Sequence, residues 1–236
     1  MAQYLIEFRF HGYAKRYAKK LIYDVSKKFR VRGVTKKKVV PHITMYGPFS
    51  TRNHRMVATT IERVVKKYEL VQFRVKDFNY FNNQQKVIYL EIEPSEELKN
   101  LRYEIAQELL KVTSSKSNQD RKRKNDFKFH STICFKDIDK KFPKIWKYLK
   151  EREEPNIHQF LLRITILRGR KILYEYDLMQ KRLLNRKQAL NHQIFLKTVN
   201  ILKQKQEKIG YIEPHFVHSK KKDNFWEKMK KLLKIR

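Results

Sequence analysis

The tripeptide His-x-Thr occurs twice in the chain, as HIT at 42–44 and as HST at 130–132. Each copy lies in an apolar run rich in β-forming residues, VVPHITMYGPF (39–49) and FKFHSTICFK (127–136). Side chains alternate between the two faces of a strand, so the histidine and threonine of each copy are predicted to share a face. Two such strands facing one cleft would surround a phosphate with two imidazoles and two hydroxyls. The alternative is a pair of strand histidines that are unrelated in space.

The two imidazoles suggest acid–base cleavage of a phosphodiester, because imidazole titrates near neutral pH, with an unperturbed pKa of about 6.5. In the pair His42 and His130, a neutral ring could take a proton from water while a protonated ring gives one to the leaving ribose oxygen. Such transfers contribute about 10²–10⁴-fold in rate. Thr44 and Thr132 would hold non-bridging phosphate oxygens. Either histidine could be the base, and the scheme requires no metal or other cofactor.

Strand alternation predicts three further side chains on the histidine faces. Tyr46 shares the face of His42 and could stack on a base, or could equally be a partly buried strand tyrosine. Lys128 shares the face of His130 and could contact a phosphate, although most lysines of this chain are expected to be solvated. Cys134 also falls on that face, and we interpret it as a small packing residue because nothing marks its thiol for activation.

The composition predicts a folded protein that binds a polyanion. The chain has 236 residues and a net charge of +32, from 56 Lys+Arg against 24 Asp+Glu. Nucleic acid is the first candidate partner, and an anionic membrane surface the second. One cysteine cannot form an internal disulfide, the first residues lack the apolar block of a signal peptide, and no apolar run is long enough to span a membrane. We therefore expect a soluble, cytoplasmic monomer without a membrane span.

The elements that must position the two motifs alternate along the chain. Apolar periodicity predicts helices over 14–29, 53–68, 96–112 and 138–149, and strands over 4–10, 39–46, 70–81, 86–92, 127–136, 158–167 and 171–178. Gly47-Pro48 is predicted to end the first motif strand. The stretch 113–126 is predicted to be a loop too hydrophilic to pack. The basic runs KKK (36–38) and RKRK (121–124) each precede a motif strand and could approach RNA phosphates, or could be charged loops with no set role.

Similar landmarks recur at nearly constant spacing in the two halves. The motif histidines lie 88 residues apart, and KVIYLEI (86–92) corresponds to KILYEYD (171–177) at an offset of 85. This order predicts an internal duplication of α+β units, at about 1–83 and 84–180. With its paired His-hydrophobic-Thr motifs, the chain resembles the 2H phosphoesterase superfamily, which includes 2′-5′ RNA ligases and RNA 2′,3′-cyclic phosphodiesterases. The second motif departs from the pattern only by its serine.

The resemblance covers about residues 1–180 and implies a duplicated two-lobed α+β fold with antiparallel sheets flanking a central groove. It also implies that His42 and His130 are the acid/base pair and that Thr44 and Thr132 bind phosphate. Residues 181–236 carry 16 Lys+Arg against 4 Asp+Glu and are predicted to form a basic helical C-terminal extension. Its helices are expected at about 183–208 and 224–235, packed on the domain with a basic outer face.

The leading functional hypothesis is an RNA phosphoesterase acting on 2′,3′-cyclic phosphate ends or 2′,5′ linkages, by hydrolysis or ligation. Its RNA, end-phosphorylated or tRNA-like, would bind the groove and the basic extension. One alternative is a non-catalytic RNA-binding module on the same scaffold. Another is a phosphodiesterase of small 2′,5′-linked or cyclic signalling nucleotides, which the large excess of positive charge disfavours.

Overall fold

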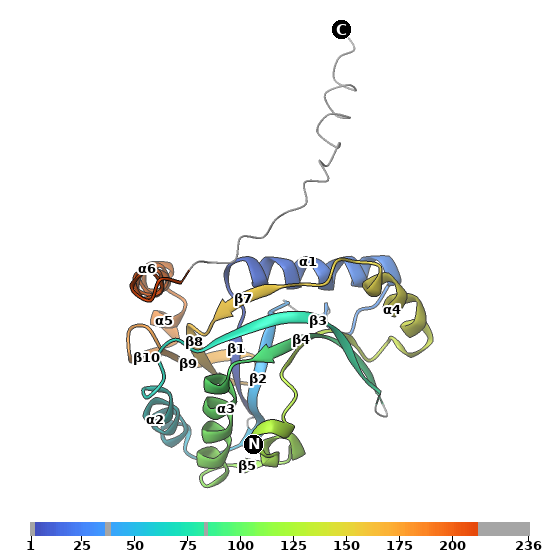
Figure 1. Cartoon of the computed structure of the whole chain (residues 1–236). Coiled ribbons are helices and arrows are strands. Elements are labelled where there is room, and N and C mark those ends of the chain that lie inside the picture. The colour runs from blue at the N-terminus through green and yellow to red at the C-terminus, as the bar shows by residue number, and fades with distance from the viewer. Residues whose placement is uncertain (1–2, 36–38, 83–84, 212–236) are drawn as a thin grey trace.

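Two antiparallel sheets form the framework of the protein (Figure 1). The structure, a computed structural model, describes residues 3–35, 39–82 and 85–211. The six-stranded sheet runs in the order β10-β9-β8-β1-β2-β5, with strands β1 (Tyr4–Arg9), β2 (His42–Ser50), β5 (Ser114–Ser115), β8 (Arg163–Arg168), β9 (Lys171–Asp177) and β10 (Arg182–Asn185). The four-stranded sheet runs β6-β4-β3-β7, with strands β3 (Gln72–Asn82), β4 (Lys86–Pro94), β6 (His130–Phe135) and β7 (Ile157–Phe160). The prediction of an α+β protein with antiparallel sheets is confirmed.

Both sheets combine strands from the two halves of the sequence. β3 comes from the first predicted repeat but pairs with β4 and β7 in the four-stranded sheet. β8 and β9 come from the second, yet β8 pairs with β1 in the six-stranded sheet. The predicted segments 1–83 and 84–180 therefore do not each form a sheet of their own. This exchange of strands ties the two sheets together.

Helices cover the sheets from opposite sides, with α1 and α4 on one side and α2 and α3 on the other (Figure 1). The helices are α1 (Gly12–Phe29), α2 (His54–Val65), α3 (Glu96–Leu110), α4 (Phe142–Lys150), α5 (Arg186–Ala189) and α6 (His192–Lys208). The side chains of Asn53 and Ser95 cap α2 and α3 by accepting backbone N–H bonds. In α1 the residues at helical spacing, Ala14, Ala18, Leu21, Ile22 and Val25, are buried. Apolar periodicity thus located these four covering helices correctly.

Two strand boundaries differ from the prediction. The apolar run 158–167, predicted to be one strand, is divided between β7 and β8, which belong to different sheets. Leu161 and Leu162 make the crossing and are both buried, so the run stays apolar where the strand is broken. The first motif strand does not end at Gly47-Pro48, because β2 continues through this cis peptide to Ser50.

The polar segment 113–126 packs against the fold through a buried ion pair, in contrast to the prediction of an unpacked loop. The Asp120 carboxylate lies 3.6 Å from Nη2 of Arg102, and both residues are 1% exposed. The same carboxylate accepts the backbone N–H of Gly47 at 3.0 and 3.1 Å and the hydroxyl of Ser115. The hydrophilic composition was misleading because the Asp120 carboxylate is buried together with a cation and with the donors that bond to it.

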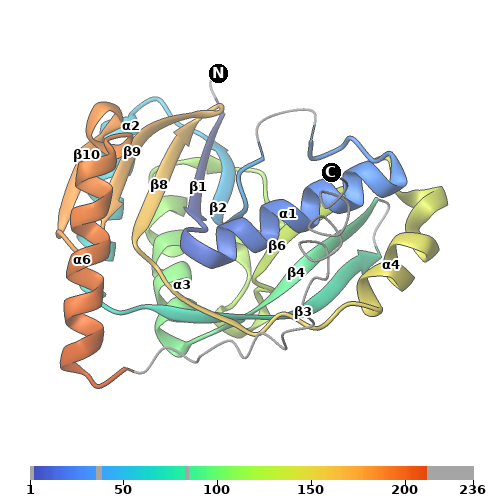
Figure 2. The same ribbon diagram turned by 90° about the horizontal axis from the view of Figure 1, so that it is seen from above.

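The predicted C-terminal extension begins as part of the sheet. Residues 182–185 form β10 and pair with β9, although the helix was predicted to begin at about residue 183. α6 then lies beside β8 and β9 (Figure 2), where the Thr198 hydroxyl bridges Arg163 (2.8 Å) and Asp177 (2.5 Å). All three residues are buried, so α6 is anchored through polar contacts in the protein interior. The predicted helix 224–235 and the KKK run at 36–38 lie outside the described residues.

Candidate active site

The two His-x-Thr motifs lie on β2 and β6, here called the motif strands, which approach within 8 Å between Cα atoms. In β2 the side chains of His42 and Thr44 are partly exposed whereas Ile43 is buried. In β6, His130 and Thr132 are likewise partly exposed, and Ser131 between them is buried. The alternation predicted from the sequence is therefore present in both strands. The serine of the second motif is on the buried face and leaves the histidine–threonine spacing unchanged.

The two motif histidines are oriented by the same local contact. Nδ1 of His42 lies 2.8 Å from the carbonyl oxygen of Val40, and Nδ1 of His130 lies 3.0 Å from that of Lys128. A carbonyl oxygen can only accept, so each ring carries a proton on Nδ1. Nε2 of each histidine is thereby left to exchange a proton with a substrate.

A carboxylate accompanies His42. Oε2 of Glu7 lies 3.7 Å from Nε2 of His42, and Glu7 is only 3% exposed. Oε1 of Glu7 accepts Nε–H of Arg9 at 2.5 Å. Glu7 and Arg9 lie on β1, directly opposite Thr44 and His42 in the β1–β2 register. Glu7 thus places a buried carboxylate beside the Nε2 edge of the His42 ring.

Aromatic rings surround His130 instead. The rings of Phe81 and Tyr89 lie 5.0 and 5.2 Å from the imidazole between centroids. Burial lowers the pKa of His130, the hydrogen bond to the Lys128 carbonyl partly offsets this, and the charge of nearby His42 lowers the pKa further. The lowered pKa keeps His130 neutral near pH 7.

The hydroxyls of Thr44 and Thr132 have no hydrogen-bond partner within the residues that the structure describes. Each lies two residues after its histidine, on the same strand face, and is partly exposed. Two free hydroxyls and two Nε2 atoms can surround one tetrahedral phosphate. Across residues 3–35, 39–82 and 85–211, no three His, Cys, Asp or Glu side chains are grouped as metal ligands.

Comparison with known proteins agrees with the motif arrangement. The family model of the 2′-5′ RNA ligase superfamily matches residues 27–168, more than half of the chain, and this segment contains both motifs. The chain belongs to the 2′-5′ RNA ligase superfamily. The resemblance to 2H phosphoesterases noted from the motifs is thereby confirmed. A search of curated proteins found no match. Glu7, Arg9 and the α5–α6 segment lie outside the part that matches the superfamily.

Sequence reasoning missed Glu7, although a signal for it was present. The first strand reads YLIEFR, in which Glu7 and Arg9 alternate with the apolar Ile6 and Phe8. This period of two indicated a strand with one polar face. That this face adjoins the first superfamily motif depends on the pairing of β1 with β2, which the sequence does not reveal.

A β-bulge in each motif strand changes the face on which two side chains were predicted to lie. Ile6 and Glu7 pair with Tyr46 and Thr44, so β2 carries an extra residue after its threonine. The same shift occurs in β6, where Ile88 and Tyr89 pair with Cys134 and Thr132. The bulges turn Tyr46 and Cys134 away from the histidine face and into the core, where they are 0% and 3% exposed.

Tyr46 therefore has no free ring face to stack on a base, and its hydroxyl lies 2.7 Å from Oγ1 of Thr113. The alternative interpretation of a buried strand tyrosine describes it better. Burial raises the pKa of the Cys134 thiol to about 12, which agrees with its interpretation as a packing residue. Lys128 orients His130 through its backbone carbonyl, and its side chain is exposed.

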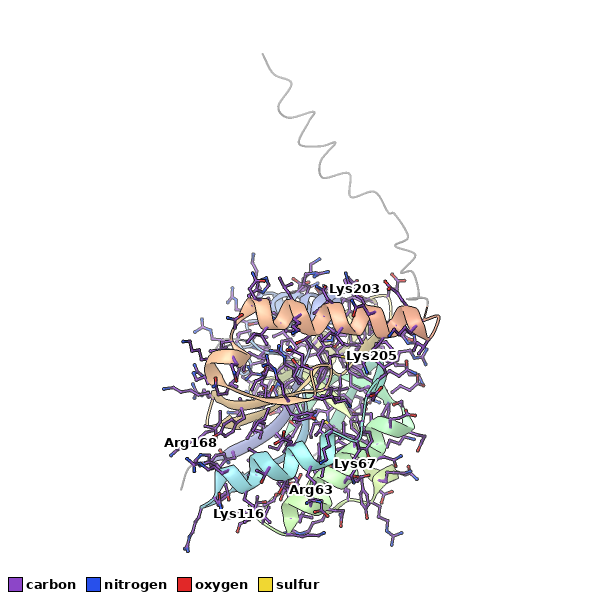
Figure 3. All side chains as sticks on the ribbon, turned by 90° about the vertical axis from the view of Figure 1, so that its left-hand side faces the viewer. Arg63, Lys67, Lys116, Arg168, Lys203 and Lys205 are labelled. Carbon is purple, nitrogen blue, oxygen red and sulfur yellow. The ribbon has the colours of Figure 1, made fainter. Side chains whose placement is uncertain are left out.

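Basic side chains gather on the face of the molecule that carries α2 and α6 (Figure 3). The labelled cations are Arg63, Lys67, Lys116, Arg168, Lys203 and Lys205. Three of them are paired with carboxylates, through Arg63–Glu108 (2.5 Å), Lys67–Glu104 (3.0 Å) and Lys205–Glu69 (3.1 Å). The other three have no ion pair within the described part of the chain.

None of the helices in the described part of the chain is both long and apolar enough to cross a lipid bilayer.

Proposed function

We propose that this protein is an RNA phosphoesterase that hydrolyses 2′,3′-cyclic phosphate ends, with His42 as general acid and His130 as general base. One observation carries the proposal. Two imidazoles, on β2 and β6, each hold a proton on Nδ1 and leave Nε2 for proton exchange, and burial lowers the pKa of His130 so that this ring is neutral near pH 7. The carboxylate of Glu7 lies 3.7 Å from Nε2 of His42, where it can orient that ring.

The proposed reaction uses neutral His130 as the base and His42, as an imidazolium, as the acid. Neutral His130 takes a proton from water as its oxygen bonds to phosphorus. The bond from phosphorus to O3′ breaks, and His42 gives its proton to O3′, which leaves a 2′-phosphate. Thr44 and Thr132 donate hydrogen bonds to the non-bridging oxygens as negative charge develops on them. With O5′ of a second strand as nucleophile, the same two transfers form a 2′,5′ linkage, and the reverse reaction cleaves one.

RNA is the favoured substrate because of the charge of the protein and its superfamily. A net charge of +32 exceeds what a small signalling nucleotide needs for binding. Each phosphate contacted on a single strand contributes about −0.7 to the slope of log affinity against log salt. We expect a slope corresponding to several phosphates for a cyclic-phosphate-ended oligonucleotide. A slope of about −0.7, as expected for one contacted phosphate, would favour the small-nucleotide alternative.

The direct test supplies purified protein with oligonucleotides ending in a 2′,3′-cyclic phosphate, a 2′-phosphate or a 3′-phosphate. We expect only the cyclic end to be consumed, and phosphorus NMR to show a 2′-phosphate product. A dinucleotide with a 2′,5′ linkage tests cleavage of that bond, with the 3′,5′ isomer as control. Binding of the oligonucleotides without any turnover would contradict the proposal and favour the non-catalytic RNA-binding module.

The assignment of acid and base predicts the pH profile. Because the pKa of His130 is lowered from 6.5, kcat/KM should fall on the acid side only below pH 6.5. Replacing Glu7 by glutamine removes the carboxylate beside Nε2 of His42, so kcat/KM at pH 7 should fall. The acid limb, which reports His130, should stay in place. We would measure kcat/KM from pH 5 to 9 for wild type and Glu7→Gln, and an acid limb that moves would contradict His130 as the base.

A further inference from the structure

A cavity lies close to His42 in the sheet and includes Arg9 of the neighbouring strand β1. It has a volume of ≈ 280 Å³ and is enclosed by the start of α1, by β8 and β9, and by the α5–α6 segment. The lining residues used below are Arg9, Lys15, Thr165, Leu190 and Phe195. The wall formed by α5 and α6 lies outside the segment that matches the superfamily.

The floor of this cavity continues the sheet face that carries His42. Arg9 lies directly opposite His42 in the β1–β2 register, and Thr165 lies opposite Glu7 in the β1–β8 register. Directly opposite residues of antiparallel strands have Cβ atoms about 4.5–5.5 Å apart and share a face. The cavity therefore begins one strand away from His42.

The lining has the chemistry of a nucleotide site. Arg9 uses Nε to bind Glu7, which leaves its two terminal amino groups for another anion. Lys15 is exposed and has no ion pair within the described residues. The α5–α6 wall is apolar in part: Phe195 is partly exposed and Leu190 is 60% exposed, next to the polar Asn191 and His192. Cations hold a phosphate, and an aromatic wall accepts a base in a cavity of about this size.

We propose that this cavity binds the nucleoside on the 5′ side of the RNA-terminal nucleotide, while Arg9 and Lys15 hold the phosphodiester between the two. The inference rests on the proposed function, because it assumes that the terminal cyclic phosphate lies between the motif histidines. Along the RNA, the preceding phosphate is one ribose away from the terminal cyclic phosphate. Arg9 is the cation directly opposite His42 on β1. The α5–α6 segment would thus make the enzyme prefer oligonucleotides over mononucleotides.

The experiment compares equilibrium binding of a dinucleotide and of a mononucleotide, each ending in a 2′-phosphate. Wild type should bind the dinucleotide about fivefold or more tightly than the mononucleotide, since one stacked base contributes at least that much. Leu190→Trp, which fills the cavity, should remove this preference and leave mononucleotide affinity unchanged. Leu196→Trp is the matched control, because Leu196 is 40% exposed on α6 and does not line the cavity.

A second pair of variants tests the phosphate contact. Lys15→Gln should weaken dinucleotide binding and reduce its salt dependence, whereas Lys20→Gln, exposed on the same helix, should do neither. Equal affinity of wild type for both ligands, or an unchanged preference in Leu190→Trp, would overturn the assignment. These measurements require no turnover. A retained preference without hydrolysis would therefore support the cavity assignment while contradicting the proposed function.

Discussion

Alanine in place of His130 is expected to lower kcat/KM for a cyclic-phosphate-ended oligonucleotide by about 10²–10⁴-fold. The variant lacks the neutral imidazole that takes the proton from water, and its threonine hydroxyls still bind the phosphate. Oligonucleotide affinity should therefore change much less than turnover. His42→Ala should show a loss of similar size, because protonation of O3′ then falls to water. The double variant should lose little more than either single one, since the two rings act as a unit.

The matched control for these variants is His158→Ala. His158 is exposed on β7, at the opposite edge of the four-stranded sheet from β6. Its loss should leave kcat/KM within about twofold of wild type, because His158 lies outside the site. Wild-type turnover in His130→Ala, with thermal unfolding showing a folded protein, would remove the catalytic role assigned to the pair.

Asp120→Ala is expected to lower the free energy of unfolding by about 3–5 kcal/mol, the usual cost of removing one partner from a buried ion pair. The substitution leaves the Arg102 guanidinium buried without its carboxylate, and Nε and Nη1 of this arginine already lack hydrogen-bond partners. It also leaves the N–H of Gly47, inside β2, without its acceptor. Urea unfolding followed by circular dichroism measures the change.

Asp126→Ala provides the comparison, because Asp126 lies in the same segment but is exposed. Its free energy of unfolding should stay within about 0.5 kcal/mol of wild type. A loss below about 1 kcal/mol in Asp120→Ala would mean that the pair contributes no more than a surface salt bridge. In that case the segment 113–126 would be held in place mainly by its other contacts.

Local patterns in the sequence were sufficient to place the motif residues. Alternation along a strand depends only on the backbone, so His42 and Thr44 were predicted to share a face before any partner strand was known. Helical periodicity located α1 to α4 for the same reason. The paired motifs also indicated the superfamily, because their residue types and spacing are carried by the chain itself.

Contacts between distant segments decided the rest. The bulges that turn Tyr46 and Cys134 into the core appear only when each motif strand is aligned with its neighbour. Likewise Glu7 on β1 lies near His42 on the neighbouring strand β2. Asp120 is buried beside Arg102 of α3, which carries the opposite charge. The sequence determined which groups could do the chemistry. The tertiary structure determined which of them meet and why the pKa of His130 is lowered, because register and burial arise from contacts between residues far apart in the chain.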